Sequence, residues 1–538
     1  MAVQDQRPDR RRRGQRSLTL NDSIPLATAR SRLWARIAPA KKSMKKDIAW
    51  NGASSLIPQL VALATVPFLL SHLGVKGYGV WALVYTVMMF AVNLDGGISS
   101  SAQRFYALYL VRGEAGLAVR FTTTLLTLIA FGTALMYALG PIIAQAVLAF
   151  ANVPAELQRD ARLLLTNIGL LIGLMLSSNI LVGYLRAANR FRAIAVCTLV
   201  AQIGYVIAIV LLAEQLTVAR MLTIALVQMG IMNALLIANC ATHLARVRFR
   251  FLPRTDVKEL CSYAWRAQIM NASGLVILQT DSLFVAAFLP IEQLGYLAIA
   301  SQVASGFRSL PMFALAPLLS RVTHVFGKEG FDRATQFASS RNRIWVNLIA
   351  TYATISVATI GFGVRAWAGD YPAAEVAVVI LTLGNALNLL TGVATAYCRA
   401  IGRPGIEAKY GLVLVIGNLV LSGPCTYFGG LMGAVWSTAA VQLVGVIFFH
   451  RLLRRTVPTF ARGLGQVRPF RLTLIGGCAF AFGLFSLQFP AQSLTALVVV
   501  GLAAAAPALV ELLIQRTRNS RRDGPMNEPQ TEIRKIGS

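Results

Sequence analysis

The stretch LIPQLVALATVPFLL, residues 56–70, is followed after a short turn by YGVWALVYTVMMFAV, residues 78–92, and these two runs decide the fold class. Neither run contains Lys, Arg, Asp or Glu. With its apolar flanks, each approaches the roughly 20 residues that a helix needs to cross a hydrocarbon core about 30 Å thick. A continuous apolar run without alternation is typical of a helix, and lipid excludes open strands. The stretch therefore predicts two membrane-spanning helices.

The rest of the 538-residue chain repeats this pattern. Its hydrophobic fraction is 56 % and its charged fraction 14 %, whereas soluble domains carry about 25 % charged residues. This composition excludes a water-soluble fold. We predict about fourteen spans: 48–72, 78–100, 120–149, 160–184, 193–213 and 218–242, then 261–289, 294–320, 343–367, 375–397, 406–427 and 429–449, and finally 472–489 and 493–514.

Polar segments between these runs give the domain boundaries. The N-terminal segment opens with RPDRRRRGQR but lacks the short apolar core and cleavage site of a signal peptide, so we expect a retained tail. The predicted units are a basic cytoplasmic tail at 1–47, a six-helix bundle at 48–242, a cytoplasmic linker at 243–260, a second six-helix bundle at 261–450, a linker with two extra helices at 451–514 and a cytoplasmic tail at 515–538.

The charge of the chain is strongly positive, with 51 Lys and Arg against 22 Asp and Glu. In a soluble protein this excess would indicate nucleic acid as a partner. Here the basic residues stand in short clusters between apolar runs, and most of them fall on one side when the spans alternate. This is the positive-inside pattern, so we predict that both termini are cytoplasmic and that nucleic acid is not a partner.

The two six-helix blocks are related in sequence. LGVKGYGVWAL in the first and LPIEQLGYLAI in the second align Gly79 with Gly295 without a gap. YLRAANR and YCRAIGR align Tyr184 with Tyr397. The two alignments have nearly the same offset along the chain, so one register explains both. We therefore predict an all-α membrane protein with two pseudo-symmetric six-helix bundles, related by an axis along the membrane normal, plus two C-terminal helices.

Three strings carry a family resemblance: VPFLLSHLGVKGYGVWAL (66–83), NLDGGISSSAQRFYA (93–107) and LQTDSLFVAAFLPIEQLGYLAIASQVA (278–304). The chain resembles the Wzx-type flippases of the polysaccharide transporter family in the MOP superfamily. The resemblance implies alternating-access transport of undecaprenyl-diphosphate-linked oligosaccharide units across the bacterial cytoplasmic (inner) membrane, for exopolysaccharide, capsule or O-antigen (lipopolysaccharide) synthesis. It also implies a lipid-linked oligosaccharide and membrane lipids as partners, with a polymerase and chain-length proteins of the same pathway as further candidates.

Charged residues inside spans are costly and are therefore candidates for function. Arg308 lies deep in the eighth span and Asp95 in the second, at similar depth if each helix rises about 1.5 Å per residue. They can form a neutralising structural pair. Alternatively Arg308, with Arg104 and Arg266 nearer the cytoplasm, lines a cationic cavity for the diphosphate, because guanidinium groups match phosphate oxygens two at a time.

Other residues of the spans suggest movement and coupling. Asp281 in the seventh span is a candidate for H⁺ or Na⁺ coupling, against a simple packing hydrogen bond. Pro58, Pro67, Pro311 and Pro317 permit helix kinks, either for alternating access or as static bends. The arginines of the repeated motif fit inside-loop anchors better than ligands: Arg186, Arg190, Arg399 and Arg403.

Two other functions remain in competition. A MATE-like, cation-coupled multidrug exporter would favour acidic residues in its cavity, whereas Arg308, Arg104 and Arg266 are basic. An integral-membrane glycan polymerase or glycosyltransferase would need a sizeable outer loop with paired acids, and the predicted outer turns are short. The cysteines and histidines lack metal-ligand spacing. We therefore expect a transporter that is not an enzyme, with no catalytic residues, no bound metal and no cofactor beyond a coupling ion.

Overall fold

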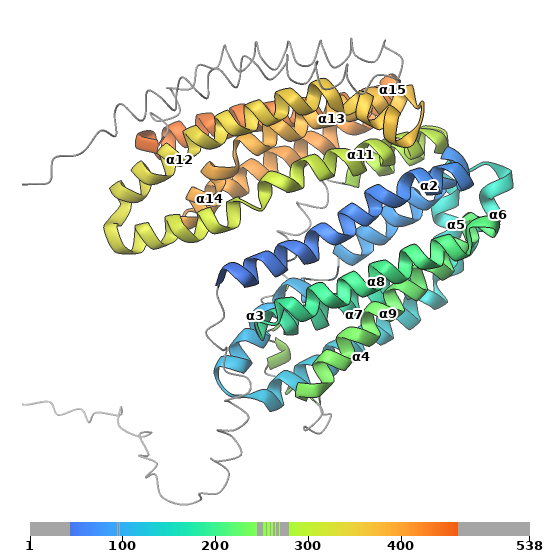
Figure 1. The fold of residues 1–538 in the computed structure, drawn as a ribbon, viewed down its shortest axis with the longest axis horizontal. Helices are drawn as coiled ribbons and strands as arrows, with labels where there is room; N and C mark the ends of the chain where they lie inside the picture. Colours follow the sequence, from blue (N-terminus) through green and yellow to red (C-terminus); the bar gives the residue numbers. More distant parts are fainter. Residues whose placement is uncertain are drawn as a thin grey trace, which may run out of the picture. The chain divides into compact units, whose positions relative to one another are not determined.

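A computed structural model describes residues 44–93, 95, 97–244, 251–253 and 279–460, together with scattered residues between 256 and 268. Residues 44–244 form the N-terminal half, whose helices pack along one another (Figure 1). These elements are α2 (Met44–Asn93), α3 (Ile98–Val111), α4 (Ala115–Ala138), α5 (Gly140–Phe150), α6 (Ala155–Thr166), α7 (Ile168–Ala187), α8 (Phe191–Leu211), the 3₁₀ turn η1 (Ala213–Gln215) and α9 (Val218–Leu244).

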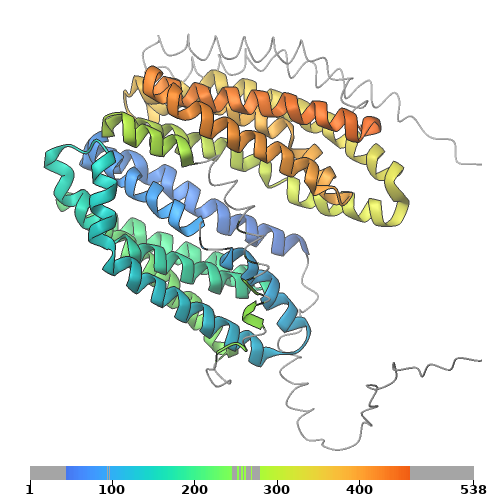
Figure 2. The same ribbon diagram turned by 180° about the vertical axis from the view of Figure 1, so that it is seen from behind.

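Residues 279–460 form the C-terminal half. Helix α13 packs against α11, α12 and α15, and is the centre of this half. The two limbs of α15 lie side by side in front, in orange, in Figure 2. After a helical segment at 279–288, the elements are α11 (Ile291–Met312), α12 (Leu315–Ala368), α13 (Pro372–Leu390), α14 (Gly392–Ala400) and α15 (Pro404–Thr456). The described residues of both halves contain helices and turns, as the apolar runs predict.

Equivalent turns mark the internal repeat. Gly113 and Gly330 both have positive φ, 74° and 82°, and each ends a short helix that leads into a long one. Asn189 (φ 55°) and Gly402 (φ 72°), which the alignment of Tyr184 with Tyr397 pairs, close the repeated motif in the same left-handed conformation. Such backbone favours Gly or Asn because other side chains crowd the following carbonyl. The predicted duplication is therefore visible in the backbone.

The helices follow most of the predicted spans, with interruptions that periodicity did not reveal. Eight helices among the described residues are long and apolar enough to cross a membrane, and two of them, Ala49–Asn93 and Pro404–Thr456, each hold two predicted spans. The expected span at 78–100 is broken after Asn93, and that at 294–320 is broken after Met312. The last two expected spans lie outside the described residues, so a total of fourteen stays a prediction.

The two halves contact each other near the turn at Gly74 and the start of α11. A Cβ added to Gly79 would lie 2.3 Å from the Ile291 carbonyl oxygen, and one added to Gly295 would lie 2.7 Å from the Val75 oxygen. Only glycine permits this approach of two backbones. Gly79 and Gly295 are the residues that the sequence repeat aligns. The pseudo-two-fold relation therefore places equivalent glycines against each other.

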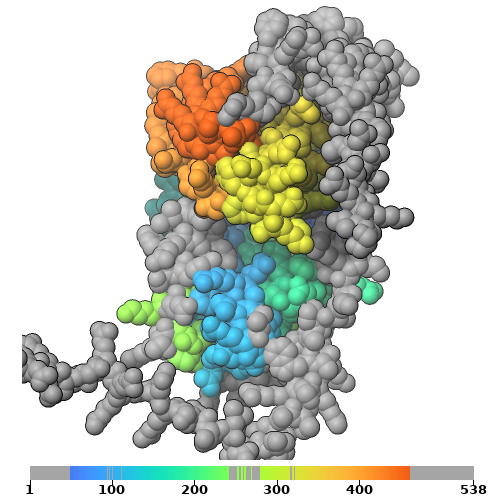
Figure 3. Space-filling view, turned by 90° about the vertical axis from the view of Figure 1, so that its left-hand side faces the viewer, coloured from blue at the N-terminus to red at the C-terminus, as the bar shows by residue number. Residues whose placement is uncertain are grey.

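The opposite end carries the arginine-rich turns. We call it the basic end, defined by the helix ends and turns at 112–114, 186–192, 399–403 and 454–456. The α3–α4 turn around Arg112 and the bend of α12 at Gly330 are exposed here, in light blue and yellow in Figure 3. The positive-inside rule predicts that this end is cytoplasmic.

Candidate functional site

Arg308 lies in the last turns of α11, beside α12, α13 and α15. Helix α11 is fixed there by two contacts of its backbone: Asn385 donates to the Ala304 oxygen (3.3 Å) and Tyr352 donates to the Phe307 oxygen (3.0 Å). The phenol of Tyr410 on α15 interacts electrostatically with the guanidinium. Among the described residues, Arg308 forms no ion pair or hydrogen bond. A partly buried cation without a counter-charge is suited to hold an anion.

Asp95 occupies the break between α2 and α3 and has other partners than Arg308. Its Oδ1 accepts a hydrogen bond from the Gly97 backbone N–H and its Oδ2 one from Ser99, both at 2.8 Å. The carboxylate thus caps the start of α3. The described residues contain no ion pair between Asp95 and Arg308, so the neutralising pair that sequence depth allowed is not formed in this structure.

The other two predicted arginines are not brought beside Arg308 by any described contact. Arg104 is exposed on α3, and its guanidinium lies 5.7 Å from the centre of the Phe105 ring. Arg266 lies outside the described residues. Gln268, which the sequence did not single out, donates from Nε2 to the Asn93 oxygen at 2.9 Å. It satisfies a carbonyl that the break after α2 leaves open.

Asp281 is held in the helical segment at 279–288 against α15. Its Oδ2 accepts a hydrogen bond from the Thr438 hydroxyl, whereas its Oδ1 is buried and has no partner among the described residues. On the two limbs of α15, Ser437 donates to Ser422 at 3.3 Å. Thr426 donates to the Ser422 carbonyl oxygen. The carboxylate therefore faces an environment of hydroxyl groups.

Two amides on α15 extend this polar environment. Asn418 lies one turn before Ser422 and is 1 % exposed, and neither atom of its amide has a partner in the described part of the chain. Gln442 lies one turn after Thr438, and its Oε1 is buried and unpartnered within the same described ranges. Buried polar groups normally have hydrogen-bond partners. We call Asp281, Asn418, Ser422, Ser437, Thr438 and Gln442 the polar cluster.

The polar cluster could hold a small cation or a proton. Carboxylate, hydroxyl and amide oxygens are ligands for hard cations, and an orphaned carboxylate oxygen in the membrane is equally a site for a proton. The sequence predicted Asp281 alone. The four-residue spacing of Asn418 with Ser422, and of Thr438 with Gln442, puts each pair on one helix face and is the signal that could have found the others.

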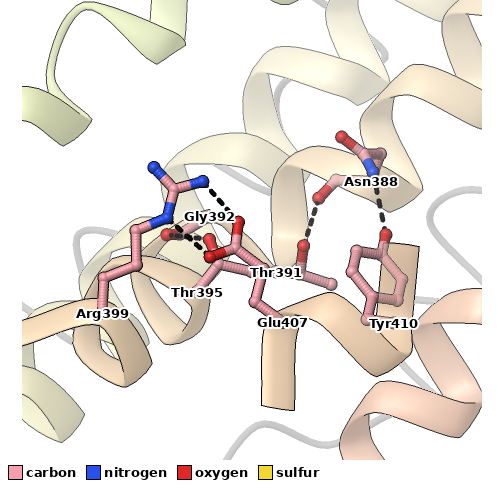
Figure 4. A network of polar contacts seen from close by, with 7 residues as sticks. All are labelled: Asn388, Thr391, Gly392, Thr395, Arg399, Glu407 and Tyr410. Carbon is pink, nitrogen blue, oxygen red and sulfur yellow. Dashed lines mark hydrogen bonds and ion pairs between the residues drawn. The ribbon is translucent and has the colours of Figure 1, made fainter. Parts of the chain in front are cut away.

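A second polar network closes the basic end of the C-terminal half (Figure 4). Asn388 of α13 donates from Nδ2 to the Tyr410 hydroxyl at 2.8 Å, and Thr391 donates to the Asn388 carbonyl oxygen at 2.8 Å. Near the ends of α14 and α15, Arg399 donates from Nε to Glu407 Oε2 at 2.6 Å and from Nη2 to Oε1. Arg399 therefore anchors a helix end, as its position in the motif suggests.

The opposite end is closed between the halves. Lys76 lies 3.5 Å from Glu292 and 3.7 Å from Glu156. Deeper down, Trp367 donates to the Leu63 oxygen at 2.9 Å and Gln59 donates to Ser309 at 2.9 Å. Together with the crossing of Gly79 and Gly295, these contacts join α2 to α11 and α12.

The prolines that the sequence predicts to permit kinks differ in whether the helix is broken beside them. Pro58 and Pro67 lie inside α2, where the only non-helical backbone is at Gly74. Pro311 is in the last turn of α11, and Pro317 is in the first turn of α12, so these two flank the break at 313–314. The break in α11–α12 therefore coincides with a proline pair, whereas the main bend of α2 is at a glycine.

Residues 44–323, just over half of the chain, match the family model described as "Polysaccharide biosynthesis protein". The chain belongs to this family. No curated protein sequence matched. The resemblance read from the sequence and this match agree on a family of polysaccharide biosynthesis.

Solved structures show the same fold at low sequence identity. The lipid II flippase MurJ in an inward closed conformation has a TM-score of 0.67 at 12 % identity, over 86 % of this chain and 98 % of that one. A multidrug resistance MATE transporter in an inward-facing conformation has 0.59 at 12 %, over 82 % and 100 %. The Vibrio cholerae MATE transporter VcmN has 0.54 at 12 %, over 80 % and 100 %. These three proteins are transporters, and this chain shares their fold.

Proposed function

We propose that this chain is a flippase that moves undecaprenyl-diphosphate-linked oligosaccharide units across the bacterial inner membrane for exopolysaccharide, capsule or O-antigen synthesis. Membership of the polysaccharide biosynthesis family supports the pathway. The observation that supports a diphosphate-linked substrate is Arg308, a cation in α11 without a counter-charge among the described residues. A diphosphate would supply that charge, since guanidinium binds phosphate oxygens strongly.

Movement would occur by alternating access between the halves. The contacts around Gly79 and Gly295 close the end opposite the basic end, so the diphosphate would enter from the basic, cytoplasmic end. Opening the other end requires separation of these glycines and of the Lys76–Glu292 pair. The breaks at Asp95 and at 313–314 offer the bends that such a change needs.

Coupling would reside in the polar cluster. Asp281 has one carboxylate oxygen occupied by Thr438 and one that no described residue occupies and that can take H⁺ or Na⁺. A charge change at this position alters the packing of the segment at 279–288 on α15, and so can bias the two states. Arg104 and Arg266 stay proposed members of the diphosphate path, at its cytoplasmic end.

A multidrug exporter is the second candidate, and the buried carboxylate of Asp281 and the MATE-like fold favour it. Deletion of the gene distinguishes the flippase from the multidrug exporter. A flippase predicts loss of one surface polysaccharide and accumulation of its lipid-linked unit on the cytoplasmic face, restored by the wild-type gene. Normal glycan with a fall in drug resistance alone would identify an exporter.

The proposed location carries its own test. Both termini are placed in the cytoplasm, with a polymerase and chain-length proteins as partners on the periplasmic side. Reporter fusions after Gly74, Pro290 and Asp370 are expected to report periplasmic, and fusions after Arg254 and Arg455 cytoplasmic. A periplasmic signal at Arg254 would overturn this topology.

A further inference from the structure

The repeated motif at the basic end contains an arginine in each half. This arginine pairs with a carboxylate in the C-terminal half, and with none among the described residues of the N-terminal half. In the C-terminal half, two nitrogens of the Arg399 guanidinium, Nε and Nη2, donate to the two carboxylate oxygens of Glu407, in the first turn of α15 (Figure 4). In the N-terminal half the equivalent arginine is Arg186, in the last turn of α7. The same alignment pairs Glu407 with Ile194, in the first turn of α8.

Arg186 is held in place by close packing of α7 on α3. A Cβ on Gly183, one turn earlier on the same face, would lie 3.5 Å from Ala102 of α3. The Tyr184 ring lies edge-on to Tyr106, with centroids 5.3 Å apart. The Arg186 Nε is buried and has no hydrogen-bond partner in the described part of the chain, while the residue as a whole remains partly exposed. Arg186 therefore combines a buried N–H that lacks a partner with a partly accessible side chain.

The chain offers Arg186 no counter-charge in the part that the structure describes. The first turn of α8 adds another cation, Arg192, beside the buried Ile194. Glu114, at the start of α4, is the acid of the neighbouring turn, but among the described residues it forms no ion pair with Arg186, and its Oε2 is itself unpartnered. A partly buried charge that lacks a partner is destabilising, and the repeat shows which partner fits: a group with two oxygens, as in Glu407.

We propose that Arg186 binds a phosphate group, supplied by an anionic phospholipid of the leaflet at the basic end, and that this phosphate takes the place that Glu407 fills in the other half. Phosphate presents oxygens in the two-pronged geometry that guanidinium prefers. Basic pockets between helices at the cytoplasmic side attract anionic headgroups. This site is separate from Arg308 and does not rest on the transport activity.

The test measures thermal unfolding of the purified full-length protein in detergent. A ligand that binds the folded state raises the unfolding midpoint. We expect phosphatidylglycerol to raise it more than phosphatidylcholine, and Arg186→Gln to remove most of this difference. Inorganic diphosphate, added without lipid, identifies the other source of the same chemistry: an Arg186-dependent shift with diphosphate but not with phosphatidylglycerol would overturn the assignment to lipid.

Exchanging the partners between the halves makes the test independent of a single variant. Glu407→Ile leaves Arg399 without its partner and is expected to add a lipid-dependent shift, which is lost again in Glu407→Ile with Arg399→Gln. Ile194→Glu gives Arg186 an internal partner and is expected to suppress the shift. Glu114→Gln should leave it unchanged. Equal lipid shifts in wild type and Arg186→Gln, or a loss of the shift in Glu114→Gln equal to that in Arg186→Gln, would contradict the proposal.

Discussion

The N-terminal and C-terminal halves share their order of helices and their left-handed turns, but their interiors differ in polarity. The alignment of Tyr184 with Tyr397 pairs buried Ser422 in the C-terminal half with buried Ile209 in the N-terminal half, and buried Ser437 with buried Ile224. The alignment of Gly79 with Gly295 pairs Asp281 with Thr65. The Thr65 hydroxyl donates to its own helix, at the Val61 oxygen. At these positions the shared fold does not require a polar side chain, so the polar cluster is an addition to one half.

This difference teaches where function resides in a duplicated scaffold. Both halves must pack their helices, so features that they share, such as Gly79 with Gly295, serve the architecture. Features that only one half has are not required by the shared architecture, and so are candidates for function. Unpartnered buried polar groups cost free energy. Both described halves have such groups, but at Asn418 and Gln442 in the C-terminal half they stand with Asp281 in the polar cluster. The proposed coupling site therefore belongs to the C-terminal half.

The largest effect is expected from removing the charge that distinguishes the halves. Asp281→Asn should lower glycan export by about 5- to 150-fold, the range given by coupling free energies of about 1–3 kcal/mol. The protein level should stay normal, because the amide oxygen can still accept from Thr438. Export of the surface polysaccharide, normalised to protein abundance, is the measurement. Thr65→Val, at the equivalent position, is the control, and a loss of export as large as that of Asp281→Asn would erase the proposed asymmetry.

An intermediate effect is expected from the feature that the halves share. Gly79→Ala and Gly295→Ala each place a methyl group against a carbonyl oxygen of the other half. Each should destabilise the closed arrangement by about 1–3 kcal/mol, the usual cost of overpacking. Thermal unfolding midpoints and export should fall to a similar degree in both variants. Gly132→Ala, which meets nothing within 4 Å, is the matched control. A defect in only one of the two would show that the crossing is not symmetric in its role.

The smallest effect is expected at the basic end. The Arg399–Glu407 pair is partly exposed, with 56 % of the Arg399 side chain accessible. Exposed ion pairs contribute about 0.2–1 kcal/mol. Arg399→Gln should therefore lower the unfolding free energy by no more than this and leave export near the wild-type level. A collapse of export in Arg399→Gln, with normal protein abundance, would move the substrate path to the basic end of the C-terminal half.

The sequence predicted most helices and the repeat, because apolar runs and aligned motifs depend on local composition. It missed the break after Asn93, because Asp95 sits in an apolar context where a cap at a new helix start resembles a charge within a span. It also missed Gln268 and Asn418, whose roles depend on contacts between distant elements. Arg308 was found from its cost in the membrane, whereas its lack of a carboxylate partner among the described residues required the structure.

The most direct test of the proposed flippase compares Arg308 variants in reconstituted vesicles that carry the diphosphate-linked oligosaccharide lipid. Transfer of that lipid between leaflets is measured at equal protein abundance. If Arg308 holds the diphosphate, Arg308→Lys should transfer poorly because it lacks the two-pronged guanidinium, and Asp95→Asn combined with Arg308→Gln should be as inactive as Arg308→Gln alone. Wild-type transfer in the double variant would contradict this account and leave Arg308 as part of the scaffold.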